Sequence, residues 1–189
     1  MVLLNKLIRP GGKKKPGPPP ALVSPASKPA KSVFSKGYFC LGLLLLTAFA
    51  IQEFGNLGWP WLAELQSDDV YKQLSGFTIV GYLVHQWHCS LLRNQGLMQK
   101  AAKLLDRHKL LGALAPVFFY AHAQHIGYAY LQVLSLGYFA IFLTGLCNVE
   151  ITGIRKPWFR KIWITVHVGL ATGLLFLLGY HIFISYAYQ

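Results

Sequence analysis

The chain has 189 residues, of which 54% are hydrophobic and 13% charged, and its formal net charge is +12. Long uncharged runs in such a composition exclude an ordinary soluble domain. The basic residues lie in short clusters between the apolar runs, so the positive charge indicates membrane topology and no nucleic-acid binding. Three cysteines without CxxC or CxxCH spacing argue against a disulfide framework, a zinc site and a covalently attached haem.

Residues 1–36 form a basic segment rich in proline, glycine and lysine, which cannot pack a core. We predict a cytoplasmic tail whose first residues, MVLLNKLIR, touch lipid headgroups. This stretch lacks the continuous apolar region of a signal peptide. Two alternatives stay open: a docking arm for a partner subunit, and a cleaved organelle-targeting peptide.

Residues 37–189 are predicted to form an all-α integral membrane bundle of about five transmembrane helices. The apolar runs place these helices at residues 37–54, 74–92, 106–123, 128–149 and 158–187. The run from 108 to 149 is divided because one helix of that length would reach about 63 Å, twice the hydrocarbon thickness. The polar, glycine-containing stretch AHAQHIGYAY supplies the break, and Pro116 is expected to kink the third helix.

Charge orients these helices in the bilayer. Basic residues gather in the N-terminal segment, between the second and third helices, and between the fourth and fifth helices. The acidic residues Glu64, Asp68 and Asp69 fall on the opposite side. The positive-inside rule therefore predicts a multi-pass protein with its N-terminus inside and its C-terminus outside. The third and fifth helices then run parallel to each other.

Two pairs of histidines with the same spacing lie on these parallel helices: His108 and His122 on the third, His167 and His181 on the fifth. A separation of 14 residues is about 21 Å along a helix and returns a side chain to within about 40° of its starting direction. Each helix thus presents two imidazoles on one face. Two such helices facing each other create two sites with a nitrogen ligand from either side, the arrangement that a bis-histidine haem b requires. A histidine within hydrocarbon is a functional candidate by default.

The stretches HKLLGALAPVFFYAH and WFRKIWITVHVGLATGLLFLLGYH resemble the ferric-reductase-like transmembrane domain family. This family supplies the haem b core of ferric reductases, NADPH oxidases and the haem subunit of bacterial methionine sulfoxide reductase. The likeness covers residues 106–185, and its matching positions are His108, Leu111, Gly112, His122, Trp158, Arg160, His167 and His181. The resemblance implies that His108 and His167 ligate an inner haem, and that His122 and His181 ligate an outer haem.

Further residues are candidates for contacts with the haems. Gly112 and Gly169 would give room to a macrocycle edge, although glycines on such helices also serve helix packing. Basic side chains near the inner face are plausible counter-charges for haem propionates, or serve topology alone; they are Arg93, Arg107, Lys109 and Arg160.

Three histidines remain outside the two predicted pairs. His85 and His88 are neighbours on one helix face, so they cannot ligate both sides of one iron. Either could bond a propionate, line a quinone pocket, contribute to a third haem with a partner subunit, or face water. His125 is close enough to His122 to be the outer ligand in its place.

These patterns predict a membrane cytochrome b subunit that passes single electrons across the bilayer through two stacked haems. No GxGxxG follows a strand and no flavin domain is expected, so the electrons would be exchanged with partner redox proteins or a quinone. Two alternatives stay open. One is a non-redox structural subunit of a large membrane complex, whose histidines form interhelical hydrogen bonds. The other is a terminal metalloreductase with an outer ion site near Trp59, Trp61 and the three acidic residues.

Overall fold

The computed structural model describes residues 33–188, with side chains from residue 36 onward. The predicted tail of residues 1–36 lies almost wholly outside the described residues. The helices of the described part are α1 (Val33–Phe54), α2 (Pro60–Ser67), α3 (Asp69–Asn94), α4 (Met98–Ala113), α5 (Ala115–His122), α6 (Tyr130–Leu146), α7 (Val149–Thr152) and α8 (Pro157–Ala187). No strand occurs among these residues, and the predicted all-α class is confirmed.

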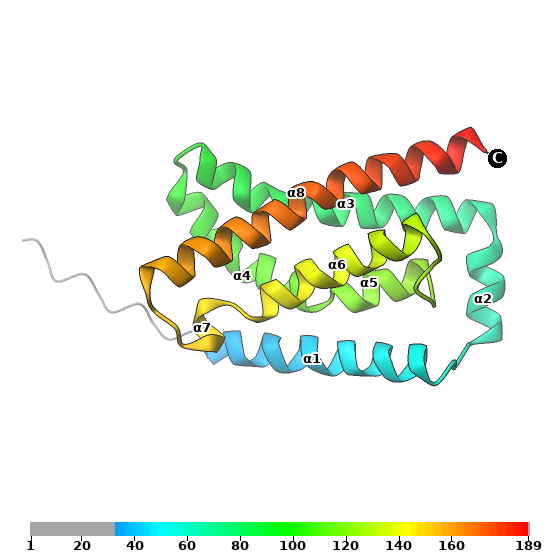
Figure 1. Cartoon of the computed structure of the whole chain (residues 1–189), viewed down its shortest axis with the longest axis horizontal. Coiled ribbons are helices and arrows are strands. Elements are labelled where there is room, and N and C mark those ends of the chain that lie inside the picture. Colours follow the sequence, from blue (N-terminus) through cyan, green and yellow to red (C-terminus); the bar gives the residue numbers. More distant parts are fainter. Residues whose placement is uncertain (1–32, 189) are drawn as a thin grey trace, which may run out of the picture. The chain divides into compact units, whose positions relative to one another are not determined.

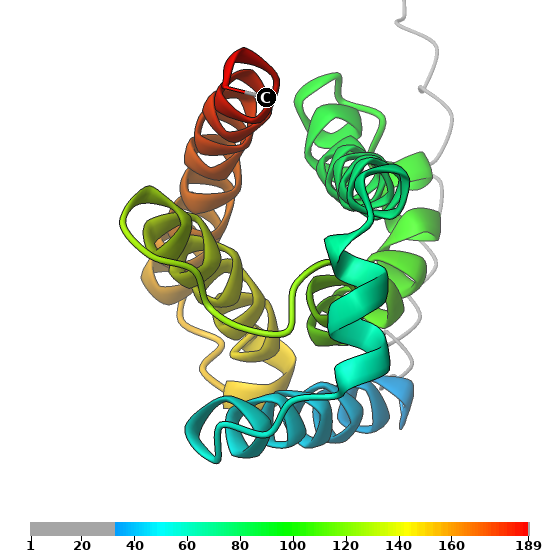
Figure 2. The same ribbon diagram turned by 90° about the vertical axis from the view of Figure 1, so that its right-hand side faces the viewer.

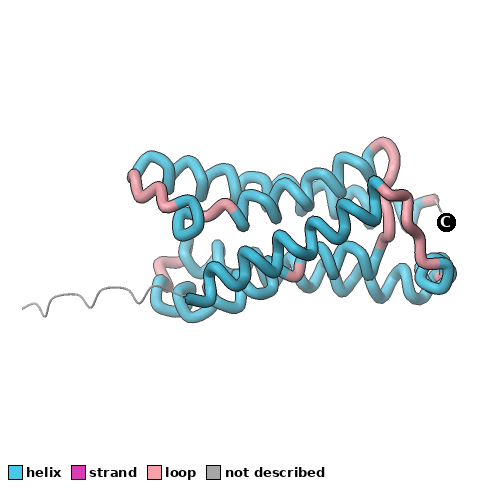
Figure 3. Tube along the Cα trace, turned by 90° about the horizontal axis from the view of Figure 1, so that it is seen from below, coloured by secondary structure: helices cyan, strands magenta, loops and turns pink. Residues whose placement is uncertain are grey.

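The long helices form two walls joined along one edge. Helices α6 and α8 pack along each other in one wall, and α3 packs on α4 and α5 in the other. Helix α1 contacts α4, α5 and α6 and so connects the walls, which Figure 2 shows end-on. Helices α1, α4, α5 and α8 run in one direction, and α3 and α6 run in the other (Figure 1). Most connecting loops therefore gather at the two ends of the bundle (Figure 3).

Two of the five predicted spans meet the length and composition of a membrane-crossing helix. They are Lys36–Phe54 within α1 and Pro157–Ala187, which is α8, with mean hydropathies of 1.6 and 1.9. Helix α6 is apolar but shorter, with 17 residues. Only 17% and 11% of the two apolar segments are buried, so most of their surface faces away from the other helices.

The third helix was predicted to be continuous, and this prediction is wrong. It is divided into α4 and α5. Leu114 ends one helix and begins the next, with φ −84° and ψ 0°. Pro116 lies in the first turn of α5 and has no N–H for the carbonyl of Gly112, so the ladder of hydrogen bonds stops here. The expected effect of Pro116 is thus confirmed, as a break between two helices.

Other boundaries also differ from the prediction. Helix α3 begins at Asp69 and not at residue 74, and α4 begins at Met98 and not at residue 106. The fourth helix ends at Leu146 and not at residue 149, because Asn148 caps the separate short helix α7 through bonds from Glu150 N and Ile151 N. Helix α2 is additional. It begins at Pro60, a residue suited to the first turn of a helix, and ends where the Asp68 carboxylate accepts a bond from Tyr71 N to cap α3.

Aromatic packing joins α1 to the two walls. The Phe49 ring stacks on Phe139 of α6 at 4.8 Å between centroids and meets Phe119 of α5 edge-on at 5.4 Å. All three rings are buried. Burial of this much aromatic surface is a main source of the stability of the bundle.

Gly42 allows α1 to approach α4 and α6 closely. A Cβ at this position would lie 2.8 Å from Leu146 Cδ2, 3.3 Å from Phe142 Cζ and 3.5 Å from Ala113 Cα. We expect Gly42→Val to lower the free energy of unfolding by about 1–3 kcal/mol, because the added methyl groups force this contact apart. Denaturant unfolding of the purified protein would measure it. Gly37→Val on the same helix is the control, since a Cβ at Gly37 meets nothing within 4 Å; equal losses in both variants would contradict the prediction.

Candidate functional site

The predicted histidines meet in two facing pairs. The ring centroids of His108 in α4 and His167 in α8 are 6.2 Å apart, and those of His122 in α5 and His181 in α8 are 6.5 Å apart. A nitrogen–metal bond of about 2 Å, with about 1.1 Å more from nitrogen to ring centre, puts two imidazoles on opposite sides of one metal about 6 Å apart. Each pair thus has the separation that a single metal atom between the rings requires.

Both pairs depend on how the helices are arranged. The unbroken helix α8 carries His167 and His181, while His108 and His122 lie on either side of the break at Leu114. The break leaves both His108 and His122 opposite α8. Because α4, α5 and α8 run in the same direction, the two pairs lie at opposite ends of the shared interface.

Each pair borders a cavity between the two walls. The His108–His167 cavity holds about 170 Å³ and the His122–His181 cavity about 440 Å³. The second lies in the range of about 300–1,000 Å³ found for small-molecule sites, and the first lies below it. A flat ligand of the same size in both sites therefore requires the side chains around His108 and His167 to move outward.

The two cavities are separated by side chains from three helices. Leu83 of α3, Tyr138 of α6 and Leu174 of α8 border both. Leu174 is midway in sequence between the two histidines of α8 and is 4% exposed. Side chains packed at the centre of the bundle therefore fill the space between the two histidine pairs.

The side chain of His167 is bonded to a hydroxyl of α6. Thr144 Oγ1 lies 2.8 Å from His167 Nδ1 and 2.8 Å from the Ile141 carbonyl. When the hydroxyl donates to that carbonyl, it accepts a bond from Nδ1–H, and this tautomer leaves a free lone pair on Nε2. Trp163 fixes the ring further, since its indole stacks on the imidazole at 5.5 Å and 8° and its Nε1 donates to the Thr144 carbonyl.

His122 is held in the same way at the other site. Ser75 Oγ lies 3.0 Å from His122 Nδ1 and 2.8 Å from the Tyr71 carbonyl. When the hydroxyl donates to that carbonyl, His122 has its hydrogen on Nδ1 and a free lone pair on Nε2. A metal-binding histidine usually donates its other ring N–H to a nearby acceptor, which orients the ring and raises the basicity of the ligating nitrogen.

The other two histidines are held less firmly. The Tyr130 hydroxyl lies 3.5 Å from His181 Nδ1, the long end of the hydrogen-bonding range. His108 Nδ1 is buried and has no hydrogen-bond partner. Each site thus joins one firmly oriented imidazole to one that is less constrained.

Glycines lie against the firmly oriented rings. A Cβ on Gly145 would be 3.4 Å from His167 Cε1, and a Cβ on Gly76 would be 3.3 Å from His122 Cε1. A larger residue at either position would push the ring from its place. The sequence did not predict a role at the site for these glycines or for Ser75, Thr144 and Tyr130. For the last three, the one local signal was a hydroxyl group within an apolar helix.

The six predicted cofactor contacts divide into two groups. Arg93, Lys109 and Gly112 border the His108–His167 cavity. Lys109 Nζ also pairs with Glu150 at 2.7 Å. The other three, Arg107, Arg160 and Gly169, are exposed and border neither cavity.

Helical phase explains two of these three positions. Arg107 is one residue from His108 and therefore points about 100° away from it. Gly169 is two residues from His167, so it falls near the opposite face of α8. Arg160 shares the phase of His167 but lies two turns before it. Closeness in sequence was therefore a poor guide to closeness at the site.

His125 also borders the His122–His181 cavity, but its ring is paired with a residue of α1. His125 Nδ1 lies 3.0 Å from Glu53 Oε2, and Glu53 Oε1 accepts a bond from Ile126 N. It is the ring of His122 that faces His181. His85 and His88 border neither cavity.

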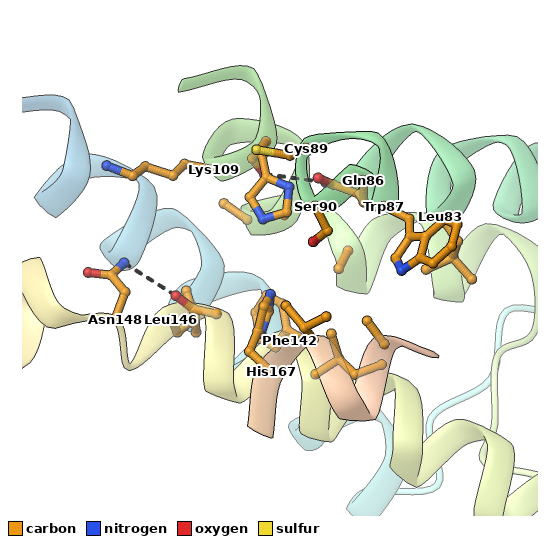
Figure 4. A pocket seen from close by; sticks show the side chains of 18 of the residues that line it. Leu83, Gln86, Trp87, Cys89, Ser90, Lys109, Phe142, Leu146, Asn148 and His167 are labelled. Carbon is orange, nitrogen blue, oxygen red and sulfur yellow. Dashed lines mark hydrogen bonds between the residues drawn. The ribbon is translucent and has the colours of Figure 1, made fainter. Parts of the chain in front are cut away.

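Figure 4 shows the His108–His167 cavity from close by. His167 points into it from α8, and Gln86 and Trp87 approach from α3 on the facing wall. Within residues 36–188, no three histidine, cysteine or acidic side chains are grouped as ligands for a metal ion. Each site therefore offers two nitrogen ligands from the described protein.

Comparison with known proteins finds no match to a protein family, a curated protein or a solved structure.

Proposed function

We propose that the chain is a membrane cytochrome b subunit that relays single electrons across the bilayer through two bis-histidine haems. The observation that carries the proposal is the pair of facing imidazole couples at 6.2 and 6.5 Å on a common helix interface. The free Nε2 atoms of His167 and His122 support it, because a ligand to iron needs that lone pair. The resemblance to the ferric-reductase-like transmembrane domain supports the same pairing.

The chain's own residues would hold each haem from both faces. His108 and His167 would ligate one, and His122 and His181 the other. Arg93 and Lys109 border the first cavity and would offset propionate charge there. The bound haem would supply an iron that changes oxidation state by one electron; the protein orients the ligands and excludes water.

A membrane location fits the surface of the helices. Large apolar side chains project from α1 and α8, with Phe176 77% exposed and Phe183 66% exposed. An apolar surface of this extent needs lipid or a partner to cover it. The proposal takes α3, the α4–α5 pair and α6 as three further spans, with the N-terminus inside and the C-terminus outside. Electrons would pass to or from partner redox subunits or a quinone.

The direct test is the absorption spectrum of the protein purified with haem available during expression. We expect a Soret band, a b-type α band in the reduced-minus-oxidised spectrum, and a haem content near two per chain. A protein without a Soret band would contradict the proposal and favour a non-redox structural subunit, whose histidines bond only to other side chains.

The ring planes predict a second spectroscopic property. Within each pair the two imidazole planes are 81° apart. Perpendicular planes interact about equally with the two iron d orbitals available for π bonding, so those orbitals stay close in energy. We expect ferric haem in both sites to give a strongly anisotropic low-spin EPR signal with one prominent low-field feature. A rhombic spectrum with three well-resolved lines would show parallel rings and contradict the prediction.

The Thr144 hydroxyl should matter to haem retention. Thr144→Val removes the acceptor of His167 Nδ1–H, and we expect haem affinity at that site to fall by about 10–100-fold. Haem transfer to apomyoglobin would measure the loss, and Thr144→Ser should retain the haem. Thr172→Val is the matched control, because the Thr172 hydroxyl bonds only the Val168 carbonyl of its own helix. Equal haem loss from both valine variants would argue against a role for the Thr144 hydroxyl.

A further inference from the structure

His108 and the neighbouring Gln86 each have one buried polar atom that forms no hydrogen bond to any described residue. These atoms are His108 Nδ1 and Gln86 Oε1. The two residues are already in contact, since Gln86 Nε2 lies 3.3 Å from the His108 carbonyl. A buried nitrogen and a buried acceptor on touching residues each cost free energy while they stay unpaired.

We infer that Gln86 is the positioning residue of His108, with its Oε1 accepting the N–H of His108 Nδ1. The amide would then hold His108 at two points, its nitrogen on the carbonyl and its oxygen on the ring. The last torsion of a glutamine side chain is soft, so the amide can turn to direct Oε1 toward the ring. The inference rests on the proposed function, because it assigns the orientation of a haem ligand.

The chemistry of an amide oxygen makes the assignment specific. This oxygen only accepts hydrogen bonds, so it selects the tautomer with hydrogen on Nδ1 and leaves Nε2 free. Thr144 and Ser75 achieve the same result at His167 and His122 when their hydroxyls donate to backbone carbonyls. Gln86 would complete the pattern at His108.

Polar groups of two other residues lie around the same cavity as Gln86. Tyr82 of α3 and Tyr138 of α6 also border it, and the Tyr138 hydroxyl donates to the Ala115 carbonyl at 2.9 Å. A hydrogen bond from Nδ1–H makes the imidazole a stronger donor to iron and favours the ferric state.

Redox titration of the full-length haem protein tests the inference in two variants with opposite expected shifts. Gln86→Met keeps the length of the side chain and removes the acceptor, so we expect the potential of the His108–His167 haem to rise. Gln86→Glu offers a stronger acceptor, so we expect that potential to fall. The His122–His181 haem is the internal reference and should not move.

Thr78→Val is the matched control on the same helix, because the Thr78 hydroxyl bonds the Leu74 carbonyl and the residue borders neither cavity, so both potentials should stay unchanged. Shifts of the same sign in both Gln86 variants, or no shift in either, would overturn the inference. If Gln86→Met loses the haem, its retention by Gln86→Glu supports the inference and its loss from both variants overturns it. Failure of the proposed function is a separate result, since the unaltered protein would then bind no haem.

Discussion

Alanine at His108 or at His167 is expected to reduce the haem content from two per chain to about one, because a bis-histidine site then loses one of its two axial ligands. The two rings face each other at 6.2 Å, so each alanine variant leaves one imidazole at this site. The His122–His181 pair lies at the other end of α8 and should keep its haem. Haem content and the reduced-minus-oxidised spectrum measure the loss.

The other pair should behave in the same manner. His122→Ala or His181→Ala is expected to remove the second haem, and combining His108→Ala with His181→Ala should remove both. His85→Ala and His88→Ala are the controls, because neither side chain borders a cavity. His125 borders the His122–His181 cavity but is bonded to Glu53, so His125→Ala should keep both haems. Loss of a haem from His125→Ala with full retention in His122→Ala would show that the pairing is wrong.

Electron transfer across vesicles is expected to need both pairs. With a membrane-impermeant reductant outside and ferricyanide trapped inside, the unaltered protein should reduce the trapped ferricyanide. His108→Ala or His181→Ala should lower the rate to that of protein-free vesicles. The physical reason is distance, since His167 and His181 are about 21 Å apart along α8 and one missing haem leaves a long gap of insulating side chains.

His88→Ala provides the control for the vesicle measurement. It changes a histidine that borders neither cavity, so the rate should match that of the unaltered protein. A variant with a single haem that reduced the trapped ferricyanide at the full rate would contradict a relay through two haems, while leaving haem binding intact. The absorption spectrum of the same vesicles distinguishes these two results.

Helix type and approximate extent were predictable because they depend on local properties. Apolar runs are visible in the sequence, and the five predicted helices overlap six helices of the described residues, with shifted ends: α1, α3, α4, α5, α6 and α8. The break at Leu114 was signalled by Pro116, because a missing N–H acts on its own helix. The caps formed by Asn148 and Asp68 moved boundaries by a few residues, a scale on which apolar periodicity carries little information.

The surroundings of the histidines were only partly predictable. Spacing and helix direction predicted which histidines would face each other, and those rings do lie together. The hydroxyls of Thr144 and Ser75 come from other helices, so their place beside a ring depends on how α6 and α3 pack. The basic residues were predicted to offset propionate charge because they lie near the inner face. Arg107 is exposed, because its helical phase points its side chain away from the cavity.

The sequence by itself determined the all-helical class, the two apolar helices long enough to cross a bilayer, and the equal spacing of two histidine pairs, because each is a property of one segment. Only the tertiary structure decided that His122 and not His125 faces His181, and that the hydroxyls of Thr144 and Ser75 lie beside Nδ1 of His167 and His122. It also placed Gln86 beside His108. These features depend on atoms from different helices meeting within a few ångströms, and that depends on the packing of the whole bundle.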